Sequence, residues 1–94
     1  MDTLIVYDIH EDGMHRGGER IVGTAENLAA YIYRIEATHR CIVTDTGDNF
    51  ILDTLGNMIN NCLDKLLLNQ LLPILIHYQM GNVDESDVPK VIYK

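Results

Sequence analysis

The chain has 94 residues, enough for one domain, and 47% of them are hydrophobic, a share too high for a disordered protein. Fourteen acidic residues against seven basic ones give a formal net charge of −7, which argues against direct nucleic-acid binding because that binding needs lysines and arginines to displace counterions. The sequence has no apolar run of about 18 residues that would span a bilayer, so we expect no membrane partner.

Two cysteines are too few for the disulfide framework of a small secreted domain. Asp2 follows Met1 at a point where a signal peptide would place basic residues. We therefore expect a cytoplasmic protein in which Cys41 and Cys62 stay reduced and act as small buried hydrophobic residues.

The first half of the chain predicts two strands followed by a helix. Residues 4–9 are β-branched, aromatic and aliphatic, which is typical of a strand, and residues 20–23 predict a short returning strand. Between them, residues 10–19 are polar and contain three glycines, so we expect a loop. Thr24 is a candidate N-cap for a helix that extends to about residue 37. Its apolar face holds Leu28, Tyr31, Ile32 and Ile35, and its polar side holds Asn27, Arg34 and Glu36.

The predicted loop contains the first candidate site, formed by His10, Glu11, Asp12 and His15. All four are residue types that bind zinc or another divalent ion. The two histidines are five positions apart with Gly13 between them, so they cannot share a helix face as the histidines of a metalloprotease motif do. A solvated loop and a loose metal site are the two interpretations. The loop lacks the lysine and the directly following helix of a phosphate-binding loop, and we expect no cofactor.

Residues 40–45 and 50–54 predict two further strands, and residues 46–48 supply the turn of a hairpin. Three aspartates would give this hairpin an acidic surface that could meet a basic partner. They are Asp45, Asp48 and Asp53. His39 and Cys41 are two positions apart and would share a face of the strand, so a reactive cysteine is the alternative to a structural one.

Residues 61–80 predict a second helix that is apolar on nearly every side. Pro73 would remove one helical hydrogen bond, so we expect a kink or two short helices that meet near Asn69. One stripe would face the core: Leu63, Leu67, Leu71, Ile74, Leu75 and Tyr78. One sheet and one helix cannot cover the remaining apolar side, which would expose a patch unusual for a monomer. We therefore predict a homodimer interface, or an interface with a protein partner, at Leu66, Leu68, Leu72 and Ile76.

Gly81 ends this helix, and the acidic stretch after it predicts an exposed tail. The expected division is one α+β domain over residues 1–81 and a tail over residues 82–94, in which residues 91–93 could add an edge strand. The predicted fold class is α+β. It has a small, mainly antiparallel sheet, the order strand, strand, helix, strand, strand, helix, and both helices packed on one face.

No pattern in the sequence indicates a catalytic group, so the sequence favours a noncatalytic protein that acts through its surface. Such a protein would be an interaction module or a small acidic accessory or inhibitor protein, self-associating as a dimer. The alternative is a small metal-binding or hydrolytic domain that uses the loop with His10, Glu11, Asp12 and His15.

Overall fold

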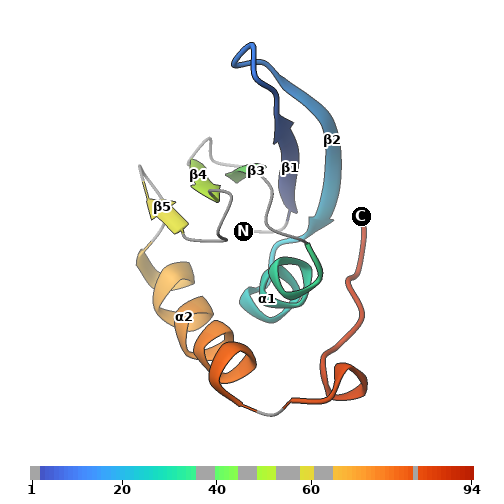
Figure 1. The fold of residues 1–94 in the computed structure, drawn as a ribbon, viewed down its shortest axis with the longest axis vertical. Helices are drawn as coiled ribbons and strands as arrows, with labels where there is room; N and C mark the ends of the chain where they lie inside the picture. Colours follow the sequence, from blue (N-terminus) through green and yellow to red (C-terminus); the bar gives the residue numbers. More distant parts are fainter. Residues whose placement is uncertain (1–2, 36–39, 45–48, 53–57, 61–64, 82) are drawn as a thin grey trace.

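The structure is a computed structural model that describes residues 3–35, 40–44, 49–52, 58–60, 65–81 and 83–94. Within these ranges, strands and helices are arranged in two layers (Figure 1). The elements are β1 (Thr3–Ile9), β2 (His15–Val22), α1 (Ala25–Arg34), β3 (Arg40–Thr44), β4 (Asn49–Leu52), β5 (Met58–Asn60), α2 (Lys65–Met80) and a short 3-10 helix, η1 (Glu85–Asp87).

The described strands form one antiparallel sheet in the order β2-β1-β3-β4-β5. A small α+β fold with an antiparallel sheet and two helices is therefore confirmed. The predicted order of elements is wrong because β5 follows the second hairpin strand before the chain enters α2. Three residues are too few to show the alternation of apolar and polar side chains by which a strand is recognised in a sequence.

The β1–β2 hairpin is longer than predicted, because residues 15–19 belong to β2 and not to a loop. Glu19, for example, pairs with Val6 of β1. Polar residues suit β2 because it lies at the edge of the sheet. The register shifts between Val6 and Asp8, and Gly17 on the facing strand has a φ of 71°, a backbone conformation that favours glycine.

Helix α1 begins as the sequence predicts and ends earlier. The Thr24 hydroxyl accepts a hydrogen bond from the backbone N–H of Asn27 at 3.1 Å, which confirms Thr24 as the N-cap. Glu26 lies in the first turn and Arg34 in the last, where each charge complements the helix dipole. Ile35 already has an extended backbone, so the helix stops at Arg34 and not near residue 37.

Helix α2 is a single helix that runs through Pro73, and the expectation of two short helices is wrong. Leu67, Leu71 and Leu75, on both sides of Pro73, are buried in the core. Burial of three leucines is worth several kcal/mol, more than the roughly 3 kcal/mol that an internal proline costs. Pro73 itself is exposed, so water can reach the Asn69 carbonyl that has lost its helical donor.

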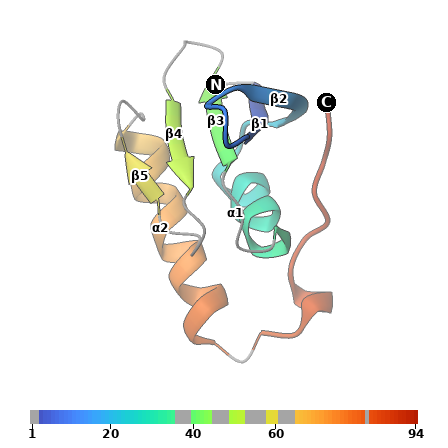
Figure 2. The same ribbon diagram turned by 45° about the horizontal axis from the view of Figure 1, so that its top comes forward.

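The hydrophobic core lies between the sheet and the two helices, which pack against each other on one side of the sheet (Figures 1 and 2). Alternate positions of β1, Leu4 and Val6, point into it, and Ile42 of β3 pairs with Val6. The largest fully buried side chains belong to three strands and both helices. They are Leu4, Ile21, Leu28, Ile42 and Leu71.

The chain after α2 passes along α1 and ends beside β2 (Figure 1). We refer to residues 83–94 as the C-terminal segment. Most of its side chains are exposed, as expected of a tail, but Val88 is buried at 3% exposure. In place of the possible edge strand over residues 91–93, a single antiparallel bridge joins Tyr93 to Ile21. The segment is thus attached to the domain between Val88 and Lys94.

Candidate functional site

The outward side of α2 carries exposed apolar side chains, which we call the α2 outer face: Leu66, Leu72 and Ile76. Their exposed fractions are 65%, 39% and 53%. Helical spacing places these three residues along one side of α2, with Asn69 and Pro73 between them, and both of these are also exposed. Leu68, the fourth residue predicted at the interface, is half-buried and packs against the core. The structure thus brings three of the four together on the surface and turns the fourth partly inward.

The opposite side of α2 explains why its outer face is exposed. Leu67, Leu71 and Leu75 repeat every four residues and point toward α1 and the sheet. Ile74 and Tyr78 flank them and are partly buried. The sheet and α1 lie on this side of α2 only (Figure 2), so the described part of the chain leaves the outer face uncovered.

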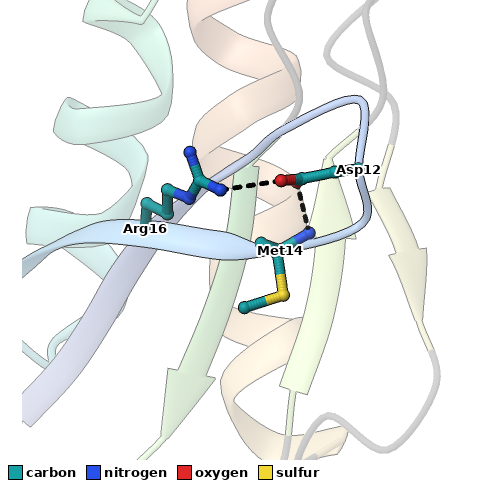
Figure 3. A network of polar contacts seen from close by, with 3 residues as sticks. All are labelled: Asp12, Met14 and Arg16. Atoms are coloured by element: carbon teal, nitrogen blue, oxygen red, sulfur yellow. Dashed lines mark hydrogen bonds and ion pairs between the residues drawn. The ribbon is translucent and has the colours of Figure 1, made fainter.

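The candidate metal loop forms a tight turn at the tip of the β1–β2 hairpin. The Asp12 carboxylate accepts a hydrogen bond from the backbone N–H of Met14 at 3.0 Å and one from the Arg16 guanidinium at 2.7 Å (Figure 3). Gly13 occupies the turn with a φ of 78°. Asp12 therefore stabilises the turn and neutralises Arg16, which accounts for its presence without a metal.

The remaining predicted ligands lie in the same turn. His10 and Glu11 are exposed, and the backbone of His10 closes the turn through hydrogen bonds with Gly13 and Met14. His15 is the first residue of β2. Among the residues that the structure describes, no group of three or more His, Cys, Asp and Glu side chains is arranged to hold a metal ion.

Cys41, the second residue of β3, is buried and pairs with Tyr7 of β1. Burial raises the pKa of its thiol above the usual value of 9.0, so the nucleophilic thiolate is disfavoured at neutral pH. This environment suits a structural cysteine. Its proposed partner His39, the second cysteine, Cys62, and the acidic-surface residues Asp45, Asp48 and Asp53 all lie outside the described residues.

A hollow lies between α1, β2 and the C-terminal segment, and charged and aromatic residues line it, among them Glu19, Tyr31, Arg34, Arg40 and Tyr93. Burial raises the pKa of Tyr31, and its hydrogen bond with Arg40 opposes this shift in part. Arg40 also forms an ion pair with Asp8 at 2.9 Å. The Arg40 guanidinium therefore has a carboxylate beside it and Glu19 also lines the hollow, so the hollow is not a strongly positive pocket for an anion.

Sequence reasoning missed the role of two polar residues of α1. Asn27 was assigned to the polar side of the helix, opposite the apolar face, but it is 5% exposed and its side chain forms hydrogen bonds with the backbone of Ile92. Arg34 bonds to the carbonyls of Val88 and Pro89. Their partners lie more than 50 positions away in the sequence, so no local spacing could indicate these contacts.

Comparisons with protein-family models, with curated proteins and with solved structures gave no match to this chain. No helix in the described ranges has both the length and the apolar composition needed to cross a membrane. The α2 outer face, with three large apolar side chains exposed, is the strongest candidate for a functional surface.

Proposed function

We propose that the chain is a noncatalytic interaction protein that self-associates through the α2 outer face. The observation that carries this proposal is the presence of three large, apolar and exposed residues, Leu66, Leu72 and Ile76, on the outward side of one helix. Removing such side chains from water is favourable by about 25 cal/mol for each Å² of apolar surface buried. A surface of this kind gains free energy when another apolar surface covers it.

A two-fold symmetric pair is the simplest assembly that covers this face. When two α2 helices pack against each other in antiparallel directions, Leu66 of one copy lies near Ile76 of the other, and the same contact occurs twice. The ten positions from Leu66 to Ile76 give a row about 15 Å long. Because Leu66 faces Ile76, the two-fold axis passes near position 71, and Asn69 of one copy would lie near Pro73 of the other.

Two chemical features support a noncatalytic role over the alternatives. The Cys41 thiol is buried with a raised pKa, which disfavours nucleophilic catalysis by this residue. The Asp12 carboxylate is occupied by Met14 and Arg16, which weakens the metal-binding or hydrolytic interpretation of the hairpin loop. A cytoplasmic location and a basic partner suited to the net charge of −7 belong to the same proposal.

The test compares two variants of the full chain that add the same charge to the same helix. Ile76→Glu places a carboxylate in the proposed interface, opposite Leu66 of the other copy, and Gln70→Glu places one at another exposed position of α2. Light scattering coupled to size-exclusion chromatography measures the mass of each, and circular dichroism checks that each is folded. At concentrations of about 0.1 mM or less, well below the roughly millimolar effective concentration of a segment tethered to its own chain, we expect Ile76→Glu to be monomeric. Gln70→Glu should be dimeric at the same concentrations, because a charge buried without a partner is strongly unfavourable and only Ile76→Glu buries one in the interface.

Two results would contradict the proposal. One is a folded Ile76→Glu variant that remains as dimeric as the wild-type protein, which would place the interface elsewhere. The other is equal loss of the dimer in both variants, which would indicate a general effect of charge and not a local contact. Native mass spectrometry of the wild-type chain also tests the alternative, since one divalent ion per chain would favour the loop with His10 and Asp12.

A further inference from the structure

The C-terminal segment pairs with the edge of the sheet through backbone hydrogen bonds, as bound extended peptides do. The backbone N–H of Val22 donates to the Ile92 carbonyl at 3.0 Å, and the N–H of Lys94 donates to the Arg20 carbonyl at 2.9 Å. An antiparallel bridge joins Tyr93 to Ile21 between them. Because β2 is the outermost strand of the sheet, this pairing is an addition of a strand to an open edge, a common mode of peptide recognition.

Asn27 recognises the main chain of the segment. Its amide nitrogen donates to the Ile92 carbonyl at 2.9 Å, and its amide oxygen accepts from the Ile92 N–H at 2.7 Å. The same nitrogen donates to the Val22 carbonyl at 2.9 Å, so Asn27 links α1, β2 and the segment. Asn27 is buried, and loss of the segment would leave its amide short of partners at a cost of roughly 1–3 kcal/mol for each unsatisfied group.

Arg34 and Val88 hold the other end of the segment. The Arg34 guanidinium donates to the Pro89 carbonyl at 2.7 Å and to the Val88 carbonyl at 3.0 Å. Val88 is the buried side chain among the described residues of the segment, and it acts as an apolar anchor. We call the edge of β2 at Arg20 and Val22, together with Asn27 and Arg34, the seam.

None of these contacts requires that the segment belong to the same copy of the chain. Only residues 81–83 connect α2 to the N-cap of η1, and the Gly81 N–H already closes the last turn of α2 on the His77 carbonyl. Short connections favour exchange of terminal elements between copies. An empty seam would leave the Val22 N–H and the Asn27 amide oxygen without the partners that Ile92 supplies, so replacement by an identical segment is favoured over simple release.

We propose that the seam also accepts the C-terminal segment of a second copy of this chain, so that two copies exchange residues 83–94. A second copy presents the Val88 anchor, the two carbonyls that Arg34 binds and the Ile92 backbone in the required register. This contact involves α1, β2 and the C-terminal segment and is separate from the α2 outer face. The proposed exchange of the segment therefore does not depend on whether α2 forms an interface.

The first test measures whether the seam of the full chain binds the segment in trans. The probe is a fluorescently labelled peptide of residues 83–94, and its anisotropy reports binding. Val88→Asp weakens binding of the chain's own segment to the seam. In the wild-type chain that segment competes with the peptide at an effective concentration of roughly millimolar. We expect Val88→Asp to bind the peptide at least tenfold more tightly than the wild-type chain does. Adding Asn27→Ala to this variant should weaken peptide binding at least tenfold.

Controls separate this result from damage to the fold. Circular dichroism must show that each variant is folded, and Val88→Ala replaces Val88→Asp if the aspartate prevents folding. A peptide that itself carries Val88→Asp should bind at least tenfold more weakly than the unmodified peptide. Folded Val88→Asp and Val88→Ala chains that fail to bind the unmodified peptide at about 1 mM would overturn the proposal, because their seams are then not able to accept a segment in trans.

The second test asks whether the source can be a second copy. One chain carries Val88→Asp and keeps an intact seam, and the other carries Asn27→Ala and keeps an intact segment. Both also carry Ile76→Glu, which removes any contribution of the α2 outer face. We expect native mass spectrometry to detect a one-to-one heterodimer in the mixture. Folded monomers alone, even where the free peptide binds, would overturn the assignment to a second copy.

Discussion

Thr24 shows how one side chain determines where a helix begins. Its hydroxyl accepts from the Asn27 N–H, one of the first backbone donors of α1 that have no carbonyl partner within the helix. The residue type and its position before an apolar run were sufficient to predict this role. The same short region also places Asn27 where its side chain reaches Ile92, which the sequence did not indicate.

Removing the Thr24 hydroxyl should destabilise the domain. We expect Thr24→Ala to lower the free energy of unfolding by about 1 kcal/mol, because the Asn27 N–H loses its acceptor. Urea unfolding followed by circular dichroism measures the change. Thr24→Ser keeps the hydroxyl and should remain within about 0.5 kcal/mol of the wild-type protein. An equal loss in both variants would contradict the capping role.

Cys41 and Tyr31 should make the stability fall at alkaline pH. Burial raises the pKa of both groups in the folded chain, so the unfolded chain loses these protons first as the pH rises. The folded state then binds more protons than the unfolded state, and the free energy of unfolding decreases with rising pH from about the unfolded thiol pKa of 9.0 upward.

Urea unfolding at pH 8 and at pH 10.5 tests this linkage. We expect a lower unfolding midpoint at the higher pH, and a smaller difference in a Tyr31→Phe variant, which has no phenol to titrate. An identical pH dependence in the wild-type protein and in Tyr31→Phe would show that Tyr31 does not contribute.

At the scale of elements, the regular patterns of the sequence predicted most of what the structure shows. Strand β1 follows its β-branched run, and α2 follows its dense leucine pattern. The part of β2 over residues 15–19 was missed because edge strands carry polar side chains and show no apolar alternation. The continuity of α2 through Pro73 was missed because burial of leucines on both sides outweighs a local preference, and that burial is a property of the folded chain.

The residues of the α2 outer face were predicted in part. Leu66, Leu72 and Ile76 were identified by counting apolar positions around α2, and all three are exposed. The same count placed Leu68 at the interface, although it packs against the core, because a helical wheel does not give the direction from which α1 approaches. The contacts of Asn27 and Arg34 with the C-terminal segment were not predictable from local pattern.

Replacing Pro73 should stabilise α2. Pro73→Ala restores a backbone N–H that can donate to the Asn69 carbonyl and removes the clash of the proline ring with the preceding turn. We expect the free energy of unfolding to rise by about 1–3 kcal/mol. The rise is reduced because alanine leaves the unfolded chain more conformational entropy than proline does. Gln70→Ala, at another exposed position of the same helix, should change it by less than about 0.5 kcal/mol. A loss of stability in Pro73→Ala would show that the proline fits a distortion that α2 requires.

For the molecule as a whole, small size and an uncovered helix face belong together. In the part of this 94-residue chain that the structure describes, one sheet and α1 pack against α2, and they reach only one side of it. A larger domain would cover the other side with a further element. We propose that a second copy takes that role here, through contacts that would keep Leu66, Leu72 and Ile76 away from water.

Sedimentation equilibrium of the wild-type chain over a range of concentrations measures this self-association. We expect a mass of twice 10.7 kDa that falls toward 10.7 kDa on dilution. Ile76→Glu should stay near 10.7 kDa below about 0.1 mM, where each chain's own C-terminal segment, at an effective concentration of roughly millimolar, occupies its seam. A folded wild-type chain that sediments at 10.7 kDa up to about 1 mM would contradict the proposed dimer, because its dissociation constant would then exceed about 1 mM, an affinity weaker than about −4.1 kcal/mol.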